Sequence, residues 1–389
     1  MSSTSDPVRL GVVGLGRAFA LTAPAIAAHP GVVPVAAAAP RAESRDAFRA
    51  AFGGRVYAEV ADLAADPEVE AVYVTTPHGM HLDHALTAIR AGKHVLVEKP
   101  MAVSLGDACA MVRAARAAGV TLIVGPSHSF DGPVKLAADL IAAGAIGGVR
   151  MIHALYATDF LYRPRRADEL STDLGGGVVF SQAIHQVDLV RRLAGGRAVS
   201  VYARTGGAWD PARPTEGAYA MMIDFADGAF ASLTYSGYAH VDGDRLMEGV
   251  SELGVPKPAA HRAARAALSA APDEAAAKRA RGFATLAECP VAETHEHFGQ
   301  VLVFGERGDL RLTPGGVEVT DDRERRFHPA PFRTTRAEVF DTLHAALRAG
   351  VPPLQSGVWG RASLEICHAL LASARTGRPQ GLVHQGETA

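Results

Sequence analysis

The stretch Val8-Arg-Leu-Gly-Val-Val-Gly-Leu-Gly-Arg-Ala-Phe19 decides the fold, because a β-like run passes through glycines directly into a helical pattern. Gly14 and Gly16 occupy the first two positions of a G-x-G-x-x-G turn. The first glycine permits a tight turn, and the second lets a pyrophosphate approach the N–H groups at the helix N-terminus. The stretch predicts a dinucleotide-binding loop, with a purely structural glycine turn as the alternative. The residues expected to bind the cofactor here are Gly14, Gly16, Arg17 and Phe19.

Strand-like and helix-like segments alternate from residue 8 to residue 125. Short apolar runs typical of strands lie at Arg9–Val13, Val32–Ala38, Glu70–Thr75, His94–Glu98 and Val120–Val124. Helical patterns lie between them, at Arg17–Ala28, Arg41–Phe52, Met80–Ala91 and Leu105–Ala118. This alternation on short links favours a doubly wound parallel sheet, so residues 1–125 are predicted to form an N-terminal Rossmann domain.

The pattern changes after residue 125, where β-like runs follow one another on short turns. They lie at Val149–Tyr156, Ala198–Arg204, Tyr219–Phe225, Ala229–Tyr235, Gln300–Gly305, Asp309–Thr313 and Val317–Thr320. Strands joined by short turns are antiparallel neighbours. Residues 126–389 are therefore predicted to form a C-terminal α/β domain with an open, mainly antiparallel sheet. Helical patterns are expected at Gly132–Ala143, from Gly175–Gly177 to Leu193, at Thr334–Ala349 and Val358–Thr376, and in an insertion at about 245–295.

The charge balance narrows the class of partner. Lys and Arg total 39 and Asp and Glu total 41, for a formal net charge of −2. This balance speaks against nucleic acid or an anionic membrane as a partner, and leaves a small-molecule substrate. The three cysteines are far apart and form no disulfide framework, and no signal-peptide pattern is visible. We therefore expect a cytoplasmic protein.

The end of the second expected strand bears on the choice of dinucleotide. An acidic residue about 20 positions after the glycine loop commonly holds the adenosine ribose 2′-OH. Ala39 stands at that place, and Arg41 and Arg45 follow it. An arginine there tolerates a 2′-phosphate, so the sequence leaves NAD and NADP both open, with Arg41 as a candidate cofactor contact.

Three further motifs carry a resemblance to a known family: Thr76-Pro-His-Gly-Met-His81, Glu98-Lys99-Pro100, and the glycines 175–177 leading to His185. With them, the chain resembles the glucose–fructose oxidoreductase, inositol dehydrogenase and rhizopine-catabolism (Gfo/Idh/MocA) family. The segments Asp159-Phe-Leu-Tyr-Arg-Pro-Arg-Arg166 and Ser181-Gln-Ala-Ile-His-Gln186 are most similar to its phthalate 4,5-cis-dihydrodiol dehydrogenases. The resemblance implies hydride transfer at a nicotinamide, and a homodimer or homotetramer formed through the C-terminal sheet.

The resemblance also implies site residues. Lys99 and His185 are the expected catalytic residues, with Ser181 standing where the family often has Asp. The further cofactor contacts implied are Thr76, Pro77, His81, Glu98 and Lys99. We expect no metal site, because His78, His81 and His84 lack an HExxH arrangement and supporting cysteines.

Oxidation of a carbinol needs a group that accepts the hydroxyl proton, and a pKa near neutral serves best. A histidine such as His185 has a pKa of about 6.5, whereas a lysine such as Lys99 must be lowered from about 10.4. A cationic Lys99 would instead stabilise an alkoxide. The structural alternatives are a Lys99–Glu98 ion pair and a His185–Asp188 pair.

Arg163, Arg165 and Arg166 cluster around one proline and are expected, with Ser181 and His185, to bind substrate. Guanidinium groups match carboxylates, so the hypothesis is a carboxylated cis-dihydrodiol that is oxidised to a catechol. A solvated loop or a subunit contact is the alternative for the arginines. Three other functions stay open: a sugar or inositol dehydrogenase, an enone or imine reductase, and a dinucleotide-binding regulator without turnover.

Overall fold

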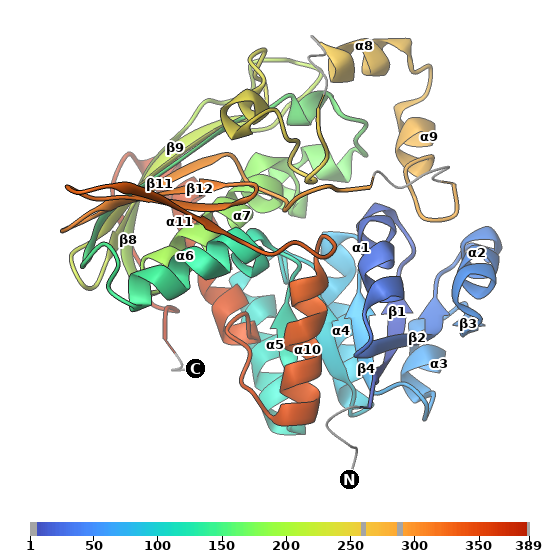
Figure 1. The fold of residues 1–389 in the computed structure, drawn as a ribbon. Helices are drawn as coiled ribbons and strands as arrows, with labels where there is room; N and C mark the ends of the chain where they lie inside the picture. Colours follow the sequence, from blue (N-terminus) through green and yellow to red (C-terminus); the bar gives the residue numbers. More distant parts are fainter. Residues whose placement is uncertain (1–5, 258–261, 286–290, 387–389) are drawn as a thin grey trace.

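A parallel sheet forms the first layer of the computed structural model, which describes residues 6–257, 262–285 and 291–386 (Figure 1). Its six strands run in the order β3-β2-β1-β4-β5-β6, and every pairing is parallel. The strands are β1 (Val8–Val13), β2 (Val32–Ala38), β3 (Arg55–Tyr57), β4 (Ala71–Val74), β5 (His94–Val97) and β6 (Leu122–Val124). The predicted doubly wound sheet is confirmed. β3 escaped prediction because three residues are too few to show a period.

Helices link these strands as the sequence predicts. They are α1 (Arg17–Ala28), α2 (Ala42–Phe52), α3 (Val60–Ala65), α4 (His81–Arg90) and α5 (Leu105–Ala118). α5 shows how local residues set the bounds: the Ser104 Oγ accepts from the Asp107 N–H at 3.1 Å, and Gly119 ends the helix at a φ of 65°. α3 is the one helix of this group that the sequence analysis did not predict.

A nine-stranded mixed sheet forms the second layer, in the order β14-β13-β12-β11-β7-β10-β9-β8-β15. Its strands are β7 (Val149–Ala157), β8 (Ala198–Thr205), β9 (Ala218–Phe225), β10 (Phe230–Ser236), β11 (Gln300–Gly305), β12 (Asp309–Thr313), β13 (Gly316–Thr320), β14 (Arg325–Pro329) and β15 (Gln380–Gly381). Among the described strands of this second sheet, only β7 and β10 pair in parallel, and the other neighbours pair antiparallel. The predicted, mainly antiparallel sheet is confirmed, with β14 and β15 as unpredicted edge strands.

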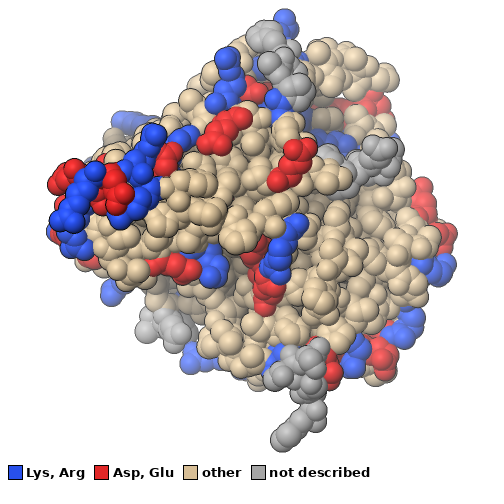
Figure 2. All heavy atoms as spheres, in the orientation of Figure 1, with Lys and Arg blue, Asp and Glu red and all other residues tan. Residues whose placement is uncertain are grey.

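Helices cover one face of this sheet and leave the other open (Figure 1). The covering helices are α6 (Gly132–Ala142), α7 (Ile184–Leu193) and α11 (Gly357–Thr376). On the other face the strand register aligns one row of side chains across the sheet, and Tyr202, Met222 and Phe327 in that row are exposed. Figure 2 shows Lys and Arg interspersed with Asp and Glu around the ends of these strands.

The last part of the chain returns to the parallel sheet. α10 (Ala337–Ala349) contacts α1, and its Val339, Phe340 and Leu343 are buried in the same apolar cluster as the β1 residues. The Phe340 ring lies 6.2 Å from the Tyr73 ring of β4, centroid to centroid. No described helix combines the length and the apolar character needed to cross a membrane.

The expected insertion is helical in part of its described residues, with turns and loops between. It contains α8 (Ala263–Ala270) and α9 (Glu274–Arg279), and α9 lies above α1 in Figure 1. The Phe283 ring packs against Phe19 of α1 and Phe52 of α2, with centroid distances of 4.8 and 6.1 Å. The insertion therefore reaches across to the parallel-sheet layer. Residues 258–261 and 286–290, the latter with Cys289, lie outside the described residues.

Candidate active site

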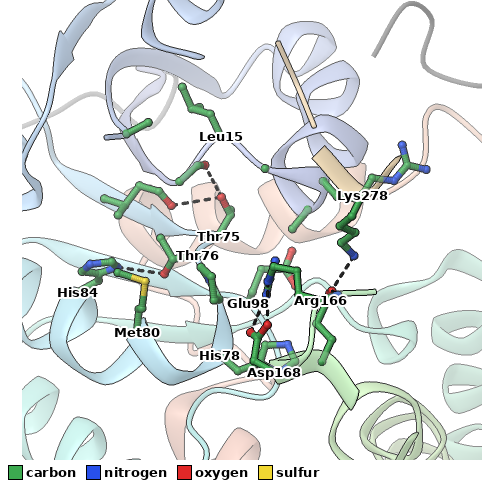
Figure 3. Close-up of a pocket in the computed structure, with 18 of the residues that line it drawn as sticks. Leu15, Thr75, Thr76, His78, Met80, His84, Glu98, Arg166, Asp168 and Lys278 are labelled. Atoms are coloured by element: carbon green, nitrogen blue, oxygen red, sulfur yellow. Dashed lines mark hydrogen bonds and ion pairs between the residues drawn. The ribbon is translucent and has the colours of Figure 1, made fainter. Parts of the chain in front are cut away.

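A cavity of about 670 Å³ lies where the parallel strands end. Its wall contains the residues that follow β1, β2, β4, β5 and β6 at their carboxyl ends, namely Gly14, Ala39, Thr75, Glu98 and Pro126. Ligands of open α/β sheets bind outside the carboxyl ends of the strands. Segments from the second layer and the insertion close the cavity from the other side (Figure 3).

The glycine loop has the shape that a pyrophosphate needs. Gly14 has a φ of +90°, and a Cβ there would lie 2.8 Å from Cγ2 of Thr76. A Cβ at Gly16 would meet open space, and Gly16 lines the cavity. Gly16 precedes α1, and no side chain caps the N-terminus of this helix. Thr75 holds the loop from below, because its hydroxyl donates to the Gly14 carbonyl at 2.5 Å (Figure 3). The uncapped N–H groups and the open backbone fit a dinucleotide.

Two expected cofactor residues lie behind this wall and are not among the lining residues. Phe19 is fully buried and packs against Phe48 and Phe283, with ring centroids 6.1 and 4.8 Å away. His81 is also buried, and its two ring nitrogens lie 2.8 and 2.9 Å from the carbonyl oxygens of Thr76 and Pro100. Both side chains brace the loops that carry the lining residues.

The far end of the cavity contains the residues that follow β2. Ala39 and Arg41 line it, and the Arg41 Nε lies 3.6 Å from the Glu43 carboxylate. The Arg45 guanidinium turns back and donates to the carbonyls of Ala39 and Pro40 at 2.8 Å each. An arginine therefore lines the region where a ribose 2′ substituent is expected, and the choice between NAD and NADP stays open.

Lys99 lines the cavity. Its Nζ donates to the Ser181 carbonyl at 3.0 Å, and no carboxylate of the described chain lies within 4.0 Å of it. Glu98 accepts from the buried Tyr73 hydroxyl at 2.8 Å, and the alternative of a Lys99–Glu98 ion pair within 4.0 Å is not observed. Burial lowers the pKa of Lys99 to about 8. A lysine in this range can exchange a proton near neutral pH.

His185 lines the cavity beside Lys99. A single turn of π-helix, Val179–Ala183, precedes α7 and carries Ser181 and Gln182, which also line the cavity. The His185 Nδ1 lies 3.4 Å from the Ser127 Oγ, and its ring packs 5.1 Å from Phe298. Burial first, and then the Lys99 charge, lower the pKa of His185 well below its usual value. His185 is therefore neutral at pH 7.

Asp188 has another role than the one considered from the sequence. Its carboxylate accepts a hydrogen bond from the indole N–H of Trp359 on α11. It therefore does not serve as the partner of His185, and the alternative of a His185–Asp188 pair is not observed. The Trp359 ring in turn lies under the Arg191 guanidinium, 3.9 Å from its centroid.

The three clustered arginines have three different surroundings. Arg163 forms ion pairs with Glu252 and Asp159 and is not among the cavity-lining residues. Arg166 lines the cavity, but its guanidinium donates two hydrogen bonds of 2.9 Å to Asp168 (Figure 3). Arg165 also lines the cavity and stacks on the Phe160 ring, 3.6 Å from its centroid.

The sequence analysis missed several lining residues from distant segments. Lys278 of the insertion donates to Glu169 at 2.8 Å, and Figure 3 shows it beside Arg166. Arg336 precedes α10, and its Nε lies 3.2 Å from Glu296. His78, one of the histidines named from the sequence, also lines the cavity, and its Nδ1 lies 2.8 Å from the Gly175 carbonyl oxygen. No local pattern marks the first two as site residues, because their partners lie 40 or more positions away in the chain.

Metal ligands do not gather at this site. Within the described ranges, no group of three or more His, Cys, Asp or Glu side chains is arranged to hold a metal ion. The histidines near the cavity instead bond to backbone or hydroxyl groups: His84 Nδ1, for example, lies 3.0 Å from the Thr76 Oγ1 (Figure 3).

Comparison with known proteins agrees with this geometry. Residues 8–126 match the oxidoreductase family with an NAD-binding Rossmann fold, and residues 134–248 match the GFO/IDH/MocA C-terminal domain. The 1-carboxy-3-chloro-3,4-dihydroxycyclohexa-1,5-diene dehydrogenase of Comamonas testosteroni is 44% identical, and the match covers 95% of each chain.

Solved structures show the same fold. A Bordetella bronchiseptica RB50 protein described as a dehydrogenase superposes with a TM-score of 0.92 at 38% identity, over 97% of this chain and 100% of that one. The WlbA dehydrogenase of Bordetella pertussis, solved with NADH and UDP-GlcNAcA, superposes with a TM-score of 0.71 at 23% identity, over 98% and 99% of the two chains. The chain belongs to the Gfo/Idh/MocA family of NAD(P)-dependent oxidoreductases.

Proposed function

We propose that the protein oxidises a carboxylated cyclohexadiene cis-diol, of the phthalate 4,5-dihydrodiol type, to the corresponding catechol. One observation carries the proposal: Lys99, with a pKa of about 8, lines the same cavity as the Gly14–Arg17 loop and the Arg165 guanidinium. A proton acceptor, a dinucleotide loop and a carboxylate-binding group thus share one space. The relative from Comamonas testosteroni, named for a carboxylated ring diol, supports this substrate class.

The cofactor residues are part of the proposal. The Gly14–Arg17 loop, Thr76, Pro77 and Glu98 line the cavity and would hold NAD or NADP, with Arg41 at the adenosine end. Phe19 and His81 would act from behind the wall. When bound, the nicotinamide supplies the hydride acceptor.

Lys99 and His185 would divide the proton chemistry. As the carbinol C–H leaves as hydride, the hydroxyl proton passes to the unprotonated Nζ of Lys99, which the Ser181 carbonyl holds in place. The neutral His185 donates a hydrogen bond to the second hydroxyl or accepts one from it. The first product is a hydroxydienone, and its tautomerisation moves the proton on the second carbinol carbon to the ketone oxygen, which gives the catechol. Aromatisation then draws the reaction forward.

The experiment is an absorbance assay at 340 nm with purified protein and two cis-diols, those of phthalate (4,5-dihydrodiol) and of benzoate (3,4-dihydrodiol). NAD and NADP are supplied in parallel. We expect growth of the reduced-nicotinamide band and formation of a catechol, and the ratio of the two rates gives the preferred cofactor. Nicotinamide binding without turnover of either diol would contradict the proposal. Sugars, inositols, enones and imines would then be tested as substrates. Turnover of one of them would indicate a sugar or inositol dehydrogenase or an enone or imine reductase, and no turnover of any would indicate a regulator.

The assembly and location are proposed on separate grounds. The exposed row with Tyr202, Met222 and Phe327 on the open sheet face would pair with a second copy, giving a homodimer or homotetramer. Met222→Asp should then yield a smaller species in light scattering, and an unchanged mass would contradict this.

The division near residue 125 and a cytoplasmic location also stay proposals, the latter because Cys109 and Cys367 are both free thiols.

A further inference from the structure

The cations around the cavity differ in whether an acidic side chain neutralises them. Arg166 is paired with Asp168, Lys278 with Glu169, and Arg336 with Glu296. Arg165, by contrast, has no carboxylate within 4.0 Å in the described part of the chain. A partly buried cation without a counter-ion is costly, so this position is electrostatically prepared for an anion from outside the chain.

The hydrogen bonds of Arg165 show which of its nitrogens are available. Its Nη2 donates to the Phe160 carbonyl at 3.1 Å, and the Phe160 ring covers one face of the guanidinium. Its Nε is fully buried and has no hydrogen-bond partner, and Nη1 donates to no described residue. Two of its nitrogens thus keep N–H groups free of partners, and an N–H group of a charged guanidinium donates a strong hydrogen bond to a carboxylate.

The insertion fixes the main chain that carries this guanidinium. The Glu274 carboxylate of α9 accepts the Arg165 backbone N–H at 2.7 Å. The same carboxylate binds both terminal nitrogens of Arg213, at 2.8 and 3.0 Å. Glu274 is thereby a positioning residue for Arg165, because it holds the backbone of Arg165 against a second buried arginine.

We propose that Arg165 binds one carboxylate on the substrate ring, and that the site selects cyclic diols with one carboxylate over those with two. The inference rests on the proposed function, and within that substrate class it places the benzoate diol, with one carboxylate, ahead of the phthalate 4,5-dihydrodiol, with two. In the proposed reaction Lys99 contacts the carbinol oxygen and is not available to a carboxylate. Arg163 and Arg166 are neutralised by Glu252 and Asp168. Apart from Arg165, the guanidinium groups of the described segment 159–169 already pair with carboxylates, so a second ring carboxylate there would carry its desolvation cost uncompensated.

Binding of product analogues tests this without any turnover. The full chain, saturated with NADH, is titrated calorimetrically with 3,4-dihydroxybenzoate, 4,5-dihydroxyphthalate and catechol, which carry one, two and no carboxylates. We expect 3,4-dihydroxybenzoate to bind at least tenfold more tightly than either of the others. Equal or tighter binding of the dicarboxylate would overturn the selectivity.

The variant Arg165→Met removes the charge and keeps the length of the side chain. It should weaken 3,4-dihydroxybenzoate at least tenfold and leave catechol within threefold, while the exposed Arg90→Met serves as the matched control. Arg165→Gln, with the thermal midpoint measured alongside, gives a second reading if the methionine variant folds poorly. Loss of NADH affinity with unchanged binding of the dihydroxybenzoate would overturn the proposal and assign Arg165 to the cofactor.

The two proposals can fail separately. Arg165-dependent binding of 3,4-dihydroxybenzoate, with no oxidation of any diol, would uphold the carboxylate site and reject the dehydrogenase reaction. Equal kcat/KM values for the benzoate and phthalate diols would uphold the reaction and overturn the selection for one carboxylate.

Discussion

The glycine loop and the segment 159–169 meet in one cavity, yet they are built by different means. At the loop, the turn depends on the φ of +90° at Gly14, a backbone conformation that glycine itself permits. In the segment, Arg163, Arg165 and Arg166 are near neighbours in sequence, and partners as distant as Glu252 and Glu274 decide which of them faces the cavity unneutralised. A local turn can be predicted from a motif, whereas the charge state of a cavity depends on long-range contacts.

The largest expected effect is at Lys99, which lines the cavity that the two regions share. Lys99→Met removes the proton acceptor, so kcat should fall about 10²- to 10⁴-fold. The affinity for the nicotinamide should change far less, because the variant leaves the glycine loop intact. Steady-state rates at 340 nm measure the first effect and fluorescence titration the second. The exposed Lys135→Met is the control, and a Lys99→Met enzyme with near-normal kcat would reject the role of Lys99.

A pair of glycine variants tests how local the loop is. Gly14→Ala forces an L-residue to a φ of +90° and a Cβ to 2.8 Å from Thr76, so unfolding stability should fall by about 1–3 kcal/mol. Gly16→Ala meets open space, so its thermal midpoint should match the wild type while its methyl group obstructs the pyrophosphate. Equal midpoints for the two variants, measured by calorimetry, would contradict the account of Gly14.

The pH dependence separates the two candidate bases. The folded pKa of Lys99 is lowered to about 8, and only its unprotonated form accepts the hydroxyl proton. The value of kcat/KM should therefore rise with pH, by about tenfold between pH 7 and 9, and level off above. Burial holds the pKa of His185 well below its usual value. A kcat/KM profile with its midpoint below pH 6.5 would therefore indicate that His185 is the base.

The smallest effect concerns the distant contact that holds the segment. Glu274→Gln keeps the size of the side chain and removes the charge that binds Arg213, so the backbone at Arg165 loses part of its support. We expect KM for a carboxylated diol to rise about fivefold, since a lost hydrogen bond contributes about 1 kcal/mol, with kcat nearly unchanged. An equal rise in KM for a diol that has no carboxylate would indicate that Glu274 supports the fold in general and does not position Arg165.

Sequence reasoning recovered most of the fold for a physical reason. Strands and helices long enough to show a period were found, while β3 and β14 were missed, because the first has three residues and the second is largely charged and exposed. At the site, Gly14 and Gly16 follow from a turn motif, and Lys99 and His185 from a family resemblance. Lys278 and Arg336 carry no local signal, since tertiary packing alone brings them to the cavity.

The most direct test of the central claim traces the hydride itself. The benzoate 3,4-cis-diol is prepared with deuterium at the carbinol carbons and oxidised by the wild-type protein, and the reduced nicotinamide is analysed by mass spectrometry. We expect one deuterium per reduced nicotinamide, together with 3,4-dihydroxybenzoate as product. Reduced nicotinamide without deuterium, or no reduction under conditions where the cofactor binds, would contradict it.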